Sequence, residues 1–116
     1  MTQRFGSDVR LRTRSEFKAV ETGGRRASGR YLTLVGRPNG RAQDRLGIIA
    51  SRRVGGAVQR NRAKRRLREL FRQRALDASR LGWDLVAIAR AEIVDAPAAV
   101  VRTDFVATLS KLRGTR

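Results

Sequence analysis

The chain has 116 residues, of which 27 are Lys or Arg and 10 are Asp or Glu, giving a formal net charge of +17. Its hydrophobic fraction of 41% is too high for a disordered basic tail, so we predict one folded domain over residues 1–116 with a polyanion as partner. Its ends, 1–8 and 113–116, are expected to fray. Without histidine or cysteine, disulfides, zinc sites and the usual nucleophile–base pairs are excluded. No apolar N-terminal segment or long apolar run is present, so we expect a cytoplasmic protein without a membrane partner.

The first half of the chain predicts a short helix followed by two strands. Residues 15–20 favour a helix capped by Ser15 and ended by the glycines at 23 and 24. Residues 31–35 combine an aromatic residue with β-branched Thr33 and Val35, as is typical of a strand. A turn is indicated at 38–40, and residues 46–51 favour a second strand. Residues 31–51 are therefore predicted to form a hairpin with a long loop.

The second half predicts helix, strand and helix. Gly55 and Gly56 break the chain before a basic helix that runs to about Leu76. Residues 83–89 are almost continuously apolar, which is typical of a strand covered on both faces. A final helix starts near Asp95 and Pro97, and its apolar stripe consists of Val101, Phe105, Leu109 and Leu112. This order predicts a small α+β sandwich, a sheet packed against helices.

The basic helix has two different faces. At about 100° per residue, one side collects the apolar stripe Ala63, Leu67, Leu70 and Phe71, and the other collects Asn61, Arg65, Arg68 and Arg72. Residues 52–74 contain ten Arg or Lys and a single acid, Glu69. A solvated charged face is the ordinary alternative, but such faces usually carry acids four residues from the bases. Here Arg62 and Arg66 are four residues apart, as are Arg68 and Arg72, so we expect these charges to lack partners. The pattern therefore favours phosphate as the counter-charge.

With these elements in place, the chain resembles the protein subunit of bacterial ribonuclease P. The resemblance rests on Arg60-Asn61-Arg62 within the segment 55–65, on Glu16-Phe17, on the run 45–48 and on the run 88–90. It implies an α-β-β-β-α-β-α order in a two-layer sandwich, with a small mixed sheet, an extra strand near 25–28 and a left-handed crossover through the basic helix. It also implies a protein that binds the catalytic RNA and the 5′ leader of precursor tRNA, while RNA and Mg²⁺ supply the catalysis.

The resemblance assigns residues to both RNA surfaces. It implies contacts to the catalytic RNA from Arg52, Arg53, Arg60, Asn61, Arg62, Lys64, Arg65 and Arg68. It implies a leader cleft formed by Phe17, Lys18, Tyr31 and Arg90, although an aromatic in a short helix is more often part of a core. Three positions depart from the family pattern, namely Glu21 and Leu34, where aromatics are common, and Gly56, where Asn is common. A ribosomal-type RNA-binding protein is the main alternative, and a stand-alone metal nuclease is disfavoured because the ten acids are scattered.

Overall fold

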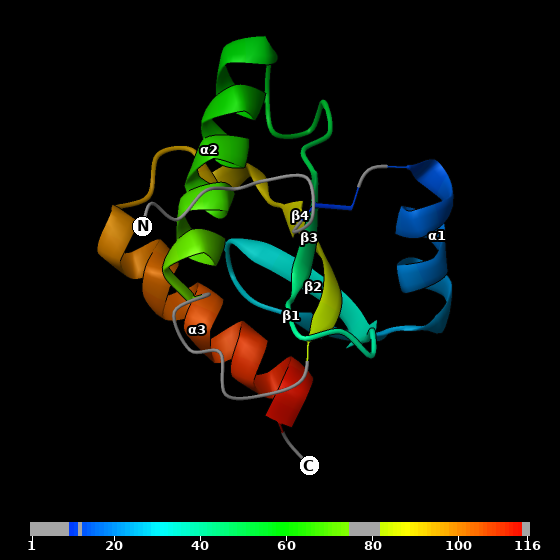
Figure 1. Ribbon diagram of the computed structural model, residues 1–116. Coiled ribbons are helices and arrows are strands. Elements are labelled where there is room, and N and C mark those ends of the chain that lie inside the picture. Colours follow the sequence, from blue (N-terminus) through cyan, green and yellow to red (C-terminus); the bar gives the residue numbers. More distant parts are fainter. Residues whose placement is uncertain (1–9, 12, 75–81, 115–116) are drawn as a thin grey trace, which may run out of the picture.

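The computed structural model describes residues 10–11, 13–74 and 82–114 (Figure 1). Its elements follow the order expected from the resemblance, including the extra strand β1. They are α1 (Arg14–Gly23), β1 (Arg25–Ser28), β2 (Leu32–Pro38), β3 (Arg45–Ile49), α2 (Ala57–Arg74), β4 (Trp83–Ala89), the 3₁₀ turn η2 (Ala91–Ile93) and α3 (Ala98–Gly114).

The four strands form one mixed sheet in the order β1-β2-β4-β3. β1 and β4 both run antiparallel to β2, whereas β3 runs parallel to β4. The predicted hairpin over 31–51 is therefore wrong, because β4 lies between β2 and β3. An apolar strand such as β4 is most stable in the middle of a sheet, and α2 is the long connection that parallel pairing of β3 with β4 requires.

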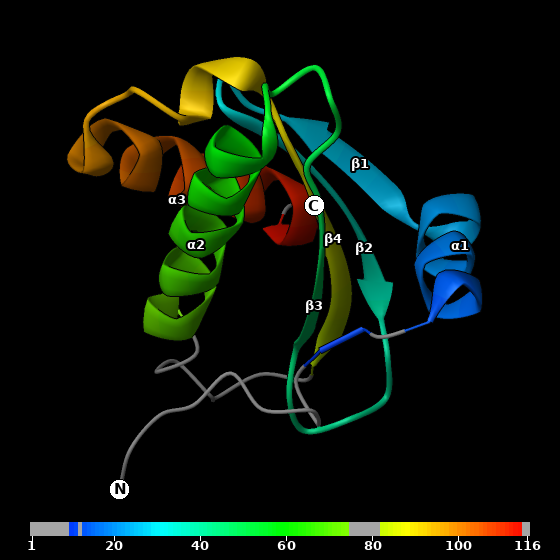
Figure 2. The same cartoon turned by 90° about the horizontal axis from the view of Figure 1, so that it is seen from above.

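Helices cover both faces of the sheet. Figures 1 and 2 show α1 on one side of the strands and α2 with α3 on the other. β4 alternates accordingly: Leu85 and Ala87 face the core beneath α2 and α3, which we call the large core, while Val86 faces α1. The second core, called the small core, consists of Leu11, Val20, Val35 and Val86 with Phe17, Ile49 and Ile88 packed against it. The expected two-layer sandwich thus has a third layer, formed by α1 alone.

The first helix begins earlier than the sequence suggested. Thr13, not Ser15, caps α1: its hydroxyl accepts a hydrogen bond from the Glu16 amide at 3.2 Å. The Glu16 carboxylate in turn accepts one from the Thr13 amide at 3.1 Å, which completes a capping box. Such reciprocal capping fixes the start of α1 and therefore the position of Phe17, one residue later.

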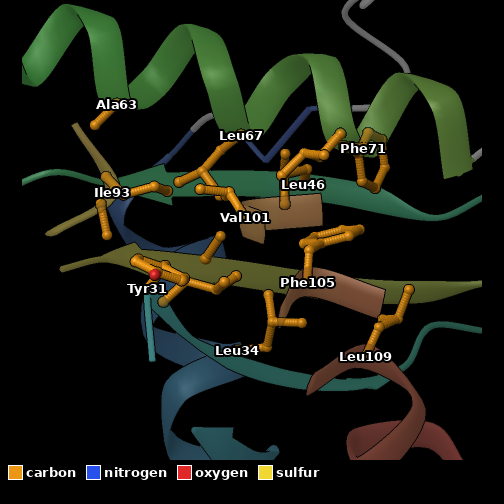
Figure 3. Close-up of a cluster of buried hydrophobic side chains, with 14 of the residues drawn as sticks. Tyr31, Leu34, Leu46, Ala63, Leu67, Phe71, Ile93, Val101, Phe105 and Leu109 are labelled. Carbon is orange, nitrogen blue, oxygen red and sulfur yellow. The ribbon is translucent and has the colours of Figure 1, made fainter. Parts of the chain in front are cut away.

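The second helix, α2, buries the apolar stripe that the helical period of the sequence predicted. Ala63, Leu67, Leu70 and Phe71 are all buried in the large core (Figure 3). The helix starts two residues after Gly55, whose φ of +140° is strained for any residue with a Cβ. Its described part ends at Arg74, and Leu76 lies outside the described residues.

The last helix, α3, is anchored by polar contacts to the segments that precede β2 and β3. The Asp104 carboxylate accepts hydrogen bonds from the amides of Arg30 and Tyr31 at 3.0 and 2.9 Å. Near its other end, Arg113 pairs with the buried Asp44 at 3.4 Å, so this residue belongs to α3 and not to a frayed end. Residues 1–8 and 115–116 lie outside the described part of the chain.

Candidate nucleic-acid interface

The exposed side of α2 carries most of the predicted RNA-contacting residues. Asn61, Arg65 and Arg68 lie opposite the buried stripe, and all three are exposed. Arg62 is also exposed, on the flank of the helix that faces α3, whereas Arg60 and Lys64 are half-buried on the opposite flank. Because the apolar stripe fixes the rotation of α2 against the sheet, Asn61, Arg65 and Arg68 are held outward, with the other three polar side chains on the two flanks.

Two further predicted residues precede the helix in a tight turn. Arg52 and Arg53 are exposed, while the next residue, Val54, is 6% exposed and packs in the large core. The Val54 amide donates to the Ser51 carbonyl at 3.0 Å, and the Gly55 amide donates to the Arg52 carbonyl at 3.1 Å. The first turn of α2 contains no acid. The turn and the helix N-terminus therefore form one positive surface.

Two arginines of α2 already have hydrogen-bond or ion-pair partners within the protein. Arg66 donates through Nη1 to the carbonyls of Ile93, at 3.0 Å, and of Ala96, which fastens the β4–α3 connection to α2. Arg72 forms an ion pair with Glu69 and lowers the pKa of that carboxyl. The expectation that charges on this helix lack partners was therefore wrong for Arg66 and Arg72, whose partners lie inside the fold.

The predicted leader residues Phe17, Lys18 and Arg90 lie on the α1 side of the sheet. The Phe17 ring lies over β3, where a Cβ added at Gly47 would come within 2.5 Å of the ring Cζ. Lys18 is the next residue of α1 and is exposed. Arg90 follows β4 and donates through Nη2 to the Thr33 hydroxyl at 3.3 Å. We call the surface formed by Phe17, Lys18, Thr33 and Arg90 the α1 surface.

Tyr31 lies elsewhere. It is 8% exposed and belongs to the large core, where Figure 3 places it among Ile93 and other residues beneath α2 and α3. The Arg30 guanidinium lies 5.6 Å from the centre of its ring. The structure therefore does not bring Tyr31 together with Phe17, because the sheet separates the two.

Leu34 is a position at which the sequence departs from the family pattern, and the alternation of side chains along β2 decides which face of the sheet it occupies. Its side chain is fully buried in the large core, so it lies on the face of β2 away from α1. The neighbouring residue Val35 faces α1 instead, in the small core. Thr33, on the same face, is 6% exposed and supports the α1 surface through its hydrogen bond with Arg90. Sequence reasoning missed it, and the period-2 alternation of β2 was the signal that could have found it.

A buried ion-pair network fixes α1 against the sheet. Arg45 binds Asp84 through two hydrogen bonds, Nε to Oδ1 at 2.9 Å and Nη2 to Oδ2 at 2.8 Å. Its Nη1 also lies 3.4 Å from the Glu16 carboxylate, and Asn39 donates to Asp84 at 2.8 Å. Burial acts to raise the pKa of Asp84, but the hydrogen bonds from Arg45 and Asn39 outweigh it and the pKa is lowered. The hydrogen bond to Asp84 raises the pKa of Arg45. Arg45 thus joins β3, β4 and the helix that carries Phe17.

The family model described as Ribonuclease P matches residues 5–113 of this chain. The chain belongs to the ribonuclease P protein family. The ribonuclease P protein component of Chloroflexus aurantiacus is 43% identical over 101 residues, covering 86% of this chain and 74% of the relative. That of Dehalococcoides mccartyi (strain ATCC BAA-2266) is 45% identical over 83 residues, covering 72% of this chain and 67% of the relative. The RNase P protein from Thermotoga maritima has a similar structure, with a TM-score of 0.78 at 31% identity, covering 90% and 98% of the two chains.

As a ribonuclease P protein, the chain is a subunit of a ribonucleoprotein endoribonuclease of tRNA processing. This finding favours the prediction of a ribonuclease P protein over the alternative of a ribosomal-type RNA-binding protein. Among residues 10–11, 13–74 and 82–114, no three His, Cys, Asp or Glu side chains gather to hold a metal ion. The described acids therefore do not fit a Mg²⁺ site. No helix of the described chain is both long and apolar enough to cross a membrane.

Proposed function

We propose that this ribonuclease P protein holds two RNA segments on two separate surfaces. The RNA subunit lies against α2 and the turn before it, contacted by Arg52, Arg53, Arg60, Asn61, Arg62, Lys64, Arg65 and Arg68. The 5′ leader of precursor tRNA lies on the α1 surface, contacted by Phe17, Lys18 and Arg90. The sheet and its two cores separate these surfaces, so residues of one surface can be substituted without altering the other.

The observation that carries the proposal is the composition of the exposed side of α2. Its buried stripe is complete, so the outward arginines are not needed for packing against the sheet. Arg62, Arg65 and Arg68 are exposed, and the only acid of the helix, Glu69, is paired with Arg72. Guanidinium groups that lack an acidic partner suit phosphate oxygens, which they bind through two parallel hydrogen bonds.

A different chemistry supports the α1 surface. A single strand is usually bound by an aromatic ring that stacks on a base and by cations that track its phosphates. Phe17 is partly buried and rests against β3, so its ring is held in place yet retains an open part. Lys18 and Arg90 supply the charges beside it. Tyr31 is left out of this proposal because it is buried on the other side of the sheet.

Catalysis is assigned to the RNA subunit. The Mg²⁺ ions that an RNA-based nuclease uses would be held mainly by RNA phosphates. The role of the protein is then to neutralise phosphate repulsion and to retain the leader while the RNA cleaves.

The two surfaces can be tested separately by substitution. Arg62→Ala combined with Arg65→Ala should weaken the affinity for the RNA subunit by about 1–3 kcal/mol per lost charge-assisted contact. The matched control is Arg25→Ala with Arg41→Ala, which removes the same charge from exposed residues away from α2. Phe17→Leu keeps an apolar contact to β3 but removes the stacking ring, so it should weaken capture of leader-bearing precursor tRNA by about 1–3 kcal/mol.

The measurements are the affinity for the RNA subunit and the holoenzyme affinity for precursor tRNA with and without its leader, with circular dichroism as the folding control. Equal losses for the α2 pair and its control would mean that only net charge matters. A loss for Phe17→Leu that persists on leaderless tRNA would place the contact outside the leader.

A further inference from the structure

A pocket of about 310 Å³ lies between α2 and α3, which pack side by side on the same face of the sheet (Figure 2). Its apolar lining consists of Leu70 from α2 and of Ala98 and Val101 from α3. Leu70 and Val101 are 8% and 1% exposed, so they form the floor, whereas Ala98 is exposed at the start of α3. The polar part of the lining consists of Arg65, Arg66, Glu69 and Gln73 from α2 and Arg102 from α3.

The polar lining carries an excess of positive charge. The Glu69 carboxylate is occupied by Arg72 and by the Gln73 amide, which donates to it at 3.1 Å. Arg65 and Arg102 are exposed, and within the described part of the chain neither donates a hydrogen bond to a carboxylate or carbonyl, although the charge of Arg102 helps to lower the pKa of Glu69. The pocket therefore presents an apolar floor beside two guanidinium groups that come from different helices.

A nucleotide combines the two properties that this lining selects. Its base is flat and apolar on both faces, and its phosphate is an anion that suits guanidinium groups. The pocket volume is near the lower limit of small-molecule sites, about 300–1,000 Å³, which suits one nucleotide better than a helix or a peptide segment. Arg65 is shared with the exposed side of α2, so the pocket is continuous with the proposed contact surface for the RNA subunit.

We propose that this pocket receives one unpaired nucleotide of the RNA subunit. The base contacts Leu70 and Val101, and its phosphate is bound by Arg65 and Arg102. The inference rests on the proposed docking of that RNA against α2. The pocket would add a contact to a base, whereas the rest of the exposed side of α2 would contact only phosphates.

The first test uses the protein alone with adenosine 5′-monophosphate as the probe. The methyl resonances of Leu70 and Val101 should shift on addition of the nucleotide and should shift much less with ribose 5-phosphate. The nucleotide should also bind several-fold more weakly to Arg102→Ala, and Arg102→Lys should restore part of the affinity. Equal shifts with ribose 5-phosphate would reduce the pocket to an anion site and overturn the proposal, as would an absence of shifts.

The second test asks whether the RNA subunit occupies the pocket. Ala98→Trp fills the space from an exposed position, and Ala107→Trp places the same ring on the opposite side of α3, where Ala107 is also exposed. The first variant should lose about tenfold in RNA affinity, within the range expected for one stacked base, and the second should lose little. Arg102→Ala provides a second variant that does not depend on how the indole packs.

The outcomes separate this inference from the docking proposal itself. If the α2 pair Arg62→Ala with Arg65→Ala weakens RNA binding while Ala98→Trp and Arg102→Ala do not, the RNA docks on α2 and the pocket proposal fails. If none of these variants changes RNA affinity, the docking proposal fails first, and the pocket proposal fails with it.

Discussion

Replacing Arg45 by Met should destabilise the fold strongly and should loosen α1 from the sheet. The Arg45 side chain is 15% exposed and that of Asp84 is 7% exposed, so the pair lies mostly out of water. Met retains much of the apolar bulk of the arginine stem but removes all three hydrogen bonds that Arg45 makes to Asp84 and Glu16. Asp84 would then keep Asn39 as a side-chain donor but would lose its positive partner.

The expected loss follows from this geometry. Removing one partner of a buried ion pair leaves the other charge buried and costs about 3–5 kcal/mol. Glu16, whose side chain is 33% exposed, adds about 0.2–1 kcal/mol at most because water screens it. Total stability for a domain is about 5–15 kcal/mol, so the variant should show a melting temperature lower by on the order of 15 °C.

The loss should also depend on pH in a defined direction. The folded pKa of Asp84 is lowered, so its contribution is present above the unfolded value of about 3.9 and disappears as pH falls through the folded pKa. In the variant, burial remains and raises the pKa of Asp84, so the folded form can take up a proton. The difference in unfolding free energy between the two proteins should therefore shrink as pH falls from about 6 to 3.

Urea unfolding of both proteins across this pH range measures the difference directly. Arg26→Met is the matched control, because Arg26 is exposed on β1, a strand that does not adjoin the β4 strand of Asp84. It should change stability by less than about 0.5 kcal/mol. A loss below about 1 kcal/mol for Arg45→Met, or a difference that stays constant with pH, would refute the reading of Arg45 as a buried ionic link.

Four further predictions concern packing, binding and catalysis. Gly47→Ala should displace the Phe17 ring, cost about 1–3 kcal/mol in unfolding free energy and weaken precursor-tRNA affinity with little change in affinity for the RNA subunit. Leu67→Ala should cost about 2–5 kcal/mol in the same assay, because Leu67 is fully buried. The affinity for the RNA subunit should fall with salt, with a slope of log K against log salt of about −4 to −7 if six to eight phosphates are contacted; a flat dependence would exclude α2 as the contact surface. The protein alone should not cleave precursor tRNA specifically at the 5′ end, measured with Mg²⁺ present and RNA absent; cleavage that tracked protein variants would show that the protein is itself catalytic.

The sequence by itself determined the features that depend on local period and composition. The buried stripe of α2, including Leu67 and Phe71, follows from a spacing of three and four residues. The almost continuous apolar run at 83–89 predicted a strand covered on both faces, which is β4. The motif around Arg60-Asn61-Arg62 was specific enough to indicate the family, which the comparisons confirm.

Only the tertiary structure decided how distant segments meet. β3 pairs with β4 and not with β2, since sheet order depends on which strand gains most from burial across the whole domain. Arg45 and Asp84 are 39 residues apart, so no local pattern could pair them. Tyr31 and Phe17 were both predicted to form the leader cleft but lie on opposite sides of the sheet. Residue type and spacing determine which side chains a segment can bury. The packing of all segments together determines which of the other side chains stay exposed on the same surface and can contact RNA.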